Sequence, residues 1–215
     1  MNMNITNNIN FTSRNSEIRF ADNLVRKINQ EFPRVSVTKI ECFKNSKEFD
    51  FLIENLWDLT SLMRSVLGRK FIKTENPVEK IKLILDTIKN KKLGNCKESA
   101  QLSLIVAKMN GIKNCKVAYL LSPENYDYDH AIVFVEGKNP YIIDAWLGFA
   151  DYVPNAIKKY QKDFRDYFDF EGSKTEKMKV VEDFGLIQHF LNNIMSNHDI
   201  NKAQTNYKEL LLRNV

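Results

Sequence analysis

The sequence predicts an α+β protein in which helices flank a small antiparallel sheet. Apolar residues recur at helical spacing before residue 93 and again after residue 154. Between these regions, three short runs rich in β-branched and aromatic residues predict strands. The chain of 215 residues is 43% hydrophobic, and no linker rich in Pro, Gly or Ser divides it. We therefore expect one domain over residues 16–215, preceded by a disordered polar leader over residues 1–15.

The N-terminal part of the domain predicts two helices with a strand between them. Apolar residues over 16–32 recur at helical spacing, and Pro33 stops that run. Residues 34–43 predict a strand, although their apolar alternation slips midway. A long apolar stripe over 46–68 predicts the second helix, and Gly68 suits its C-terminal end.

Two further helices are expected before the sheet. Asn76 suits an N-cap, with Pro77 in the first turn and Glu79 as the reciprocal partner of a capping box. The helix that follows runs out near residue 93. Residues 100–109 are apolar on nearly every side, which is typical of a buried helix, and Cys96 falls in its first turn.

The sheet is predicted from residues 115–121, 130–136 and 141–146, with a turn at Gly137 joining the last two strands. The remainder of the chain favours helices. Their expected ranges are 154–164, 173–194 and 199–213.

Composition excludes several classes of protein. Thirty-two Lys and Arg stand against 27 Asp and Glu, and the two signs are interspersed, which argues against a nucleic-acid partner. No apolar run approaches the roughly 20 residues that cross a bilayer, so we expect no integral membrane segment. Three cysteines without CxxC spacing, and three histidines, give neither a disulfide framework nor a metal motif. We expect no metal and no cofactor.

Three residues combine into a candidate catalytic site. At the start of a helix, unpaired N–H groups and the helix dipole favour the thiolate form of Cys96. His130 opens one strand and Asp144 lies near the end of the next. With a three-residue loop at Gly137, His130 lies opposite Trp146, and Asp144 becomes its diagonal neighbour on the same face of the sheet. This register allows a carboxylate to reach the imidazole.

Other residues are candidates for supporting roles. The backbone N–H of Cys96 is one donor to an oxyanion, and the side-chain amide of Asn90 or Asn95 is a candidate for the second. Trp146 is expected to pack beside the site, with a role as a wall of the substrate groove as the alternative. The other two cysteines, Cys42 and Cys115, are expected to be packing residues.

These segments resemble the Cys, His-Ala and Asp-x-Trp blocks of the transglutaminase-like, papain-fold superfamily. The resemblance covers residues 93–148, and its motifs are Gly94-Asn95-Cys96, Asp129-His130-Ala131 and Ile143-Asp144-Ala145-Trp146. Within that superfamily, the short separations are most similar to deamidase domains of dermonecrotic-type toxins and to glutamine deamidase effectors injected by bacteria. The large accessory domains of animal transglutaminases are missing.

The resemblance implies a papain-like fold with a central buried helix that bears the nucleophile Cys96. It implies His130 as base and acid and Asp144 as its orienter. The expected activity is deamidation of glutamine on a protein substrate, which for a secreted effector is a host protein. A cysteine protease, a transglutaminase and a non-catalytic binding module remain alternatives. Residues 1–15 lack the apolar core of a Sec signal, so the expected location is the bacterial cytoplasm or, after secretion, the host cell cytoplasm.

Overall fold

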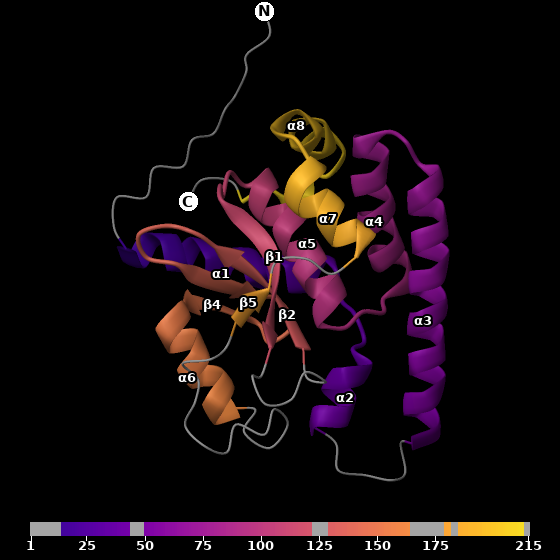
Figure 1. Ribbon diagram of the computed structural model, residues 1–215, viewed down its shortest axis with the longest axis horizontal. Helices are drawn as coiled ribbons and strands as arrows, with labels where there is room; N and C mark the ends of the chain where they lie inside the picture. The colour runs from indigo at the N-terminus through magenta and orange to yellow at the C-terminus, as the bar shows by residue number, and fades with distance from the viewer. Residues whose placement is uncertain (1–13, 44–49, 122–128, 164–178, 182–184, 213–215) are drawn as a thin grey trace, which may run out of the picture.

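The helices surround one antiparallel sheet in the computed structural model, which describes residues 14–43, 50–121, 129–163, 179–181 and 185–212 (Figure 1). The α+β class predicted from the sequence is therefore confirmed. The helical elements are α1 (Arg14–Glu31), α2 (Val37–Phe43), α3 (Asp50–Lys73), α4 (Pro77–Lys91), α5 (Cys96–Met109), α6 (Val153–Asp163), α7 (Leu186–His189), the π-helical turn η3 (Phe190–Ile194), α8 (Asn197–Asn206) and the 3₁₀ turn η4 (Lys208–Leu210). The strands are β1 (Cys115–Leu121), β2 (Asp129–Val135), β3 (Tyr141–Asp144), β4 (Phe149–Tyr152) and β5 (Lys179–Val181).

The sheet has the order β4-β3-β2-β1-β5, and every neighbouring pair is antiparallel. Successive side chains of a strand point to opposite faces, so the sheet feeds two apolar clusters. The larger cluster takes Val117, Val133 and Ile143 and packs on α5 and α1. The smaller cluster takes Ile132 and Ile142 and packs on α6. Helix α5 is consequently buried along almost its whole length.

The predicted strand over residues 34–43 is wrong, because the chain forms α2 there. Only Val35 makes a β-bridge, a parallel one with Leu93. The hydroxyl of Ser36 accepts a hydrogen bond from the backbone N–H of Lys39, and the carbonyl of Ser36 accepts from the N–H of Ile40. Ser36 thus begins a helix, and this local signal outweighs a weak strand alternation.

Helix α3 continues beyond Gly68, so the predicted helix end at that residue is wrong. The stripe on its inner side extends to Phe71, which is 1% exposed, and burial of this ring outweighs the helix-ending tendency of glycine. At the other end, Ser46 lies outside the described residues. None of the described helices has both the length and the apolar composition needed to cross a membrane.

The C-terminal third departs most from the sequence prediction. Strand β4 was not predicted, and the predicted helix over 173–194 is wrong at residues 179–181, which pair with β1 as β5. The start predicted for that helix lies outside the described residues. The last helix ends at Asn206 and gives way to a 3₁₀ turn. At the other end of the chain, α1 begins at Arg14, so residues 14–15 of the predicted leader are helical, and residues 1–13 are outside the described part.

The turn between α4 and α5 requires glycine at position 94. A Cβ atom there would lie 2.8 Å from Cβ of Glu98. We expect Gly94→Ala to lower the free energy of unfolding by about 1–3 kcal/mol, because the start of α5 must shift. Urea denaturation followed by circular dichroism measures this.

Gly68→Ala is the matched control, because a Cβ at this position inside α3 meets nothing within 4 Å. We expect this change to raise the free energy of unfolding by about 0.5–1 kcal/mol. Equal stability of Gly94→Ala and the wild type would contradict the close approach.

Candidate active site

Cys96 is the first residue of α5, and its side chain is partly exposed, whereas the rest of the helix is almost entirely buried. Asn95 precedes it as the N-cap. The backbone N–H of Asn95 donates to a carboxylate oxygen of Glu98 at 2.9 Å. As the first helical residue, Cys96 has a backbone N–H with no carbonyl partner within α5. The site therefore starts with a thiol and, at the same residue, an N–H donor that α5 itself leaves unpaired.

The start of α5 is held from outside by α3. Arg64 of α3 makes a bidentate pair with Glu98, with Nε–Oε1 at 2.7 Å and Nη2–Oε2 at 2.9 Å. Glu98 is 2% exposed, so this charge is paired away from water. Burial lowers the pKa of Arg64, but Glu98 outweighs it and raises the pKa overall. The Asn-x-x-Glu spacing of Asn95 and Glu98 is the capping signal that the sequence prediction missed here.

His130 and Asp144 meet in the structure as the predicted register requires. Strand β2 pairs with β3 through Val133 opposite Ile143, and the same register continued beyond the paired residues sets His130 opposite Trp146. The imidazole Nε2 lies 2.7 Å from Oδ2 of Asp144, and the two side chains are 3% and 1% exposed. Both residues share the parity of Ile132 and Ile142, so they belong to the face covered by α6.

The thiol of Cys96 lies close enough to His130 to contribute to the raised pKa of the imidazole. Burial lowers the pKa of His130, but the charge and hydrogen bond of Asp144, with smaller contributions from Cys96, raise it to about 10. Burial raises the pKa of Asp144, and His130 outweighs this effect and lowers it overall. The predicted residues Cys96, His130 and Asp144 are thus brought together, with an imidazolium–carboxylate pair at their centre.

Asp144 has two further partners that hold its carboxylate in place. The hydroxyl of Tyr160 donates to Oδ2 at 2.9 Å, and the backbone N–H of Leu147 donates to Oδ1, also at 2.9 Å. The ring of Tyr160 meets that of His130 edge-on, with centroids 5.6 Å apart. Burial and the neighbouring carboxylate raise the pKa of Tyr160. The sequence prediction missed this residue; its signal was the apolar pair Ala156 and Tyr160, spaced four residues apart on α6.

Trp146 packs beside the imidazole. Its ring centroid lies 5.1 Å from that of His130, and its indole N–H donates to the Ser36 hydroxyl at 2.6 Å. Its backbone carbonyl accepts from Lys39 Nζ at 2.9 Å. Trp146 therefore fixes α2 against the site, whether or not it also contacts a substrate.

The two asparagines proposed as oxyanion donors lie in different places. Oδ1 of Asn95 accepts from the Ser36 hydroxyl at 3.1 Å and from the N–H of Thr38 at 3.4 Å, so this amide joins α2 to the start of α5. Asn90 is exposed in the last turn of α4. The structure brings Asn95 to the site as Cys96's neighbour and does not bring Asn90 into the triad's hydrogen bonds.

Arg34 is a second residue that the sequence prediction missed, because no local pattern distinguishes it. Its guanidinium donates to the Ser99 hydroxyl at 2.9 Å, to the carbonyl of Phe32 at 2.9 Å and to the carbonyl of Ala145 at 3.3 Å. Burial lowers its pKa to about 10, and Asp144 and Glu98 partly offset the effect. Arg34 joins the helix bearing Cys96 to the segment that follows Asp144.

The remaining cysteines and histidines lie elsewhere. Cys115 is buried, its thiol donates to the carbonyl of Ile112 at 3.3 Å, and burial raises its pKa to about 12. Cys42 belongs to α2. His189 and His198 are exposed on α7 and α8. Over the described ranges, no three His, Cys, Asp or Glu side chains gather as a set of metal ligands.

The charge on His130 should make the stability of the fold depend on pH. Its pKa is about 10 in the folded state and near 6.5 when unfolded, so its stabilising contribution is complete below about pH 6.5 and is lost as pH rises through 10. We expect the difference in unfolding free energy between wild type and His130→Gln to shrink from pH 6 to pH 10. A pH-independent difference, measured by urea denaturation, would contradict the raised pKa.

The hydroxyl of Tyr160 should stabilise the buried pair of His130 and Asp144 through its hydrogen bond to the carboxylate. Tyr160→Phe removes a hydrogen bond to a buried carboxylate and is expected to cost about 2–3 kcal/mol in thermal or urea unfolding. Tyr207→Phe is the matched control, since it removes a hydroxyl that donates to Asp86 in a part-buried setting. We expect this control to cost about 1 kcal/mol. Equal losses in the two variants would argue against a special role for Tyr160.

Comparisons of this chain with models of protein families, with curated proteins and with solved structures found no match.

Proposed function

We propose that this protein is a cysteine-dependent acyl-transfer enzyme that deamidates a glutamine side chain of a protein substrate. The observation that carries the proposal is the buried His130–Asp144 pair, 2.7 Å apart, with the partly exposed thiol of Cys96 beside the imidazole at the start of α5. A nucleophile within reach of a base that a third group orients is the arrangement that acyl transfer needs.

In the first half-reaction, the thiolate of Cys96 attacks the carboxamide carbon and the carbonyl oxygen becomes an oxyanion. The orphan N–H of Cys96 donates to that oxyanion. His130 gives a proton to the nitrogen, the C–N bond breaks, and ammonia leaves. The product of this step is a thioester between Cys96 and the former glutamine.

In the second half-reaction, His130 takes a proton from water, and the resulting hydroxide attacks the thioester carbon. The C–S bond breaks, the thiolate of Cys96 returns beside the protonated His130, and the glutamic acid side chain of the product loses its proton to solvent and becomes a carboxylate. The raised pKa of His130 supports this sequence, because a protonated imidazole is ready to act first as an acid. Asp144 orients the ring and balances its charge during both half-reactions.

The order of the three residues also supports a papain-like, transglutaminase-like fold. The proposed nucleophile begins a buried helix, the proposed base is the second residue of β2, and the proposed acid ends β3 of an antiparallel sheet. On the motif resemblance, we further propose that the protein is a secreted bacterial effector that modifies a host protein. Fusion of residues 1–15 to a reporter in a secretion-competent bacterium tests export, and a reporter retained inside the cell counts against it.

Deamidation can be tested on glutamine-containing peptides by release of ammonia and by the mass gain of about 1 Da per event. We expect Cys96→Ala to abolish turnover without loss of the fold, because the nucleophile is gone. Cys115→Ala is the matched control: its buried thiol lies outside the triad, so turnover is expected to persist. Turnover in Cys96→Ala would reject the mechanism.

The same assay separates the alternative chemistries. Cleavage of the peptide chain would indicate a protease, and incorporation of an added primary amine would indicate a transglutaminase. Resistance of Cys96 to iodoacetamide at neutral pH, in a protein that binds a partner, would favour a non-catalytic module.

Asp144→Asn tests the orienting role. The amide cannot balance the imidazolium charge, so we expect kcat to fall by about 10²–10⁴ while KM changes little. An unchanged kcat would show that His130 needs no orienting carboxylate.

A further inference from the structure

Helix α3 carries an apolar surface that the described chain leaves uncovered. Five of the seven large hydrophobic side chains found exposed over the described residues lie on this one helix. Exposure reaches 79% for Phe51 and 68% for Ile72. We call the side of α3 that bears these residues the outer face; its apolar members are Phe51, Leu52, Leu59, Leu62 and Ile72.

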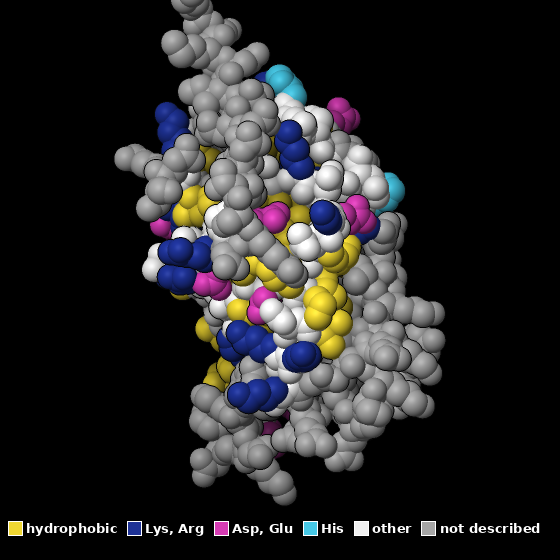
Figure 2. Space-filling view, turned by 90° about the vertical axis from the view of Figure 1, so that its left-hand side faces the viewer, with side chains coloured by type: hydrophobic (Ala, Val, Ile, Leu, Met, Phe, Trp, Pro, Cys, Tyr) yellow, Lys and Arg dark blue, Asp and Glu magenta, His cyan; other side chains and the backbone are white. Residues whose placement is uncertain are grey.

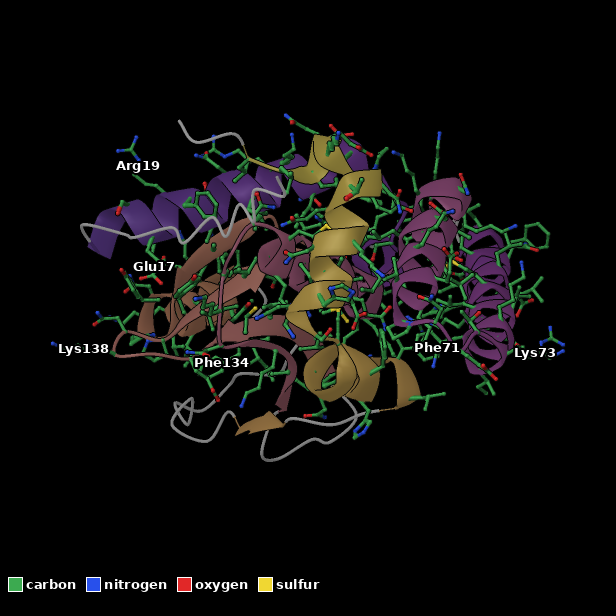
Figure 3. The ribbon with its side chains drawn as sticks, turned by 90° about the horizontal axis from the view of Figure 1, so that it is seen from above. Glu17, Arg19, Phe71, Lys73, Phe134 and Lys138 are labelled. Carbon is green, nitrogen blue, oxygen red and sulfur yellow. The ribbon has the colours of Figure 1, made fainter. Side chains whose placement is uncertain are left out.

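The opposite side of α3 already has its partners. Thr60, Met63, Leu67 and Phe71 form its buried stripe. In Figure 3, Phe71 lies on the side of α3 towards the body of the protein and Lys73 points outward. Figure 1 shows α3 at the edge of the molecule, with α4 on its inner side. The apolar residues of the outer face therefore do not contribute to the buried core of a single copy.

Charged residues on α3 are segregated along its length. The exposed acids Asp50, Glu54 and Asp58 lie in its N-terminal half, and the exposed bases Arg69, Lys70 and Lys73 lie in its C-terminal half. Elsewhere the surface is mixed: Figure 2, which views the side opposite α3, shows basic side chains lying near acidic and apolar ones. When two such helices pack antiparallel through their apolar faces, the acidic half of each lies beside the basic half of the other.

We propose that the outer face of α3 pairs with the same face of a second copy, with the two helices antiparallel about a two-fold axis. In this arrangement Leu59 and Leu62 of both copies meet near the axis, and Phe51 lies beside the partner copy's Ile72. Glu54 of each copy faces Arg69 of the other. The helix has 24 residues and spans about 36 Å, so one pairing covers all of these contacts.

Antiparallel pairing is favoured over the parallel alternative by charge. Parallel helices would place acids beside acids and bases beside bases, whereas the antiparallel pair converts each repulsion into an attraction. Two-fold symmetry makes each contact occur twice, so every favourable or unfavourable pair is doubled. The apolar residues supply the burial, and the charges select the orientation.

The site described above is not part of this interface. Arg64 points from the inner side of α3 to Glu98, whereas the pairing uses the outer face. The proposed pairing therefore does not use the contact by which α3 holds the start of α5. The inference is independent of the proposed function.

Sedimentation velocity of the full chain tests the proposal. We expect the wild type to shift with concentration from 25.2 kDa towards twice that mass. Glu54→Arg and Arg69→Glu each place like charges opposite each other twice, and each should weaken dimerisation by about 10-fold. The double variant restores opposite charges in the antiparallel pair only, so its dimerisation should return to within about 3-fold of wild type.

Lys82→Glu, at an exposed position on α4, is the control for the change in net charge and should dimerise as the wild type does. Leu62→Lys removes the apolar centre and should give a monomer with an unchanged circular dichroism spectrum. A wild-type chain that stays at 25.2 kDa up to about 100 μM would overturn the proposal. So would a double variant as weak as the single ones, since the antiparallel charge pairing would then be wrong.

Discussion

Two opposite charges held almost completely out of water organise this structure. The His130 imidazolium and the Asp144 carboxylate are each less than 5% exposed and 2.7 Å apart. Such a pair is tolerable inside a protein only when its remaining hydrogen-bonding groups are satisfied. Tyr160 and the N–H of Leu147 supply that satisfaction for the carboxylate. The position of α6 and the turn after β3 can therefore be understood as parts of a shell around one ion pair.

The same logic explains the start of α5. A thiol at the first turn of a helix is useful only if that turn is rigid, and here Glu98 fixes it from within while Arg64 fixes it from α3. Gly94 allows the close approach of the preceding turn to Glu98. The N–H donor proposed for the oxyanion, on Cys96, and the carboxylate that stabilises the helix start, on Glu98, thus lie two residues apart. Removal of Glu98 or Arg64 would therefore change the position of the Cys96 thiol.

The sequence predicted the parts of the site that depend on local patterns. The Gly137 turn and the strand alternation gave the register that joins His130 to Asp144, and the helix start gave Cys96. It could not predict contacts made between distant segments. Tyr160 reaches Asp144 from a helix that follows the sheet, and β5 pairs with β1 across a long stretch of chain. The strand predicted over residues 34–43 was wrong for another reason. The hydrogen bonds of Ser36 at the start of α2 outweighed a weak apolar alternation.

Arg34 sets a condition on how the molecule can be divided. Its bonds to Ser99 and Ala145 span 65 and 111 positions of the chain. Contacts of this range carry the entropic cost of closing large loops. The segment over residues 93–148 therefore contains Cys96, His130 and Asp144 but lacks Arg34 and Tyr160, which hold their surroundings in place. If this segment alone were moved to another scaffold, the three residues would be present, but the contacts that Arg34 and Tyr160 make around them would be missing.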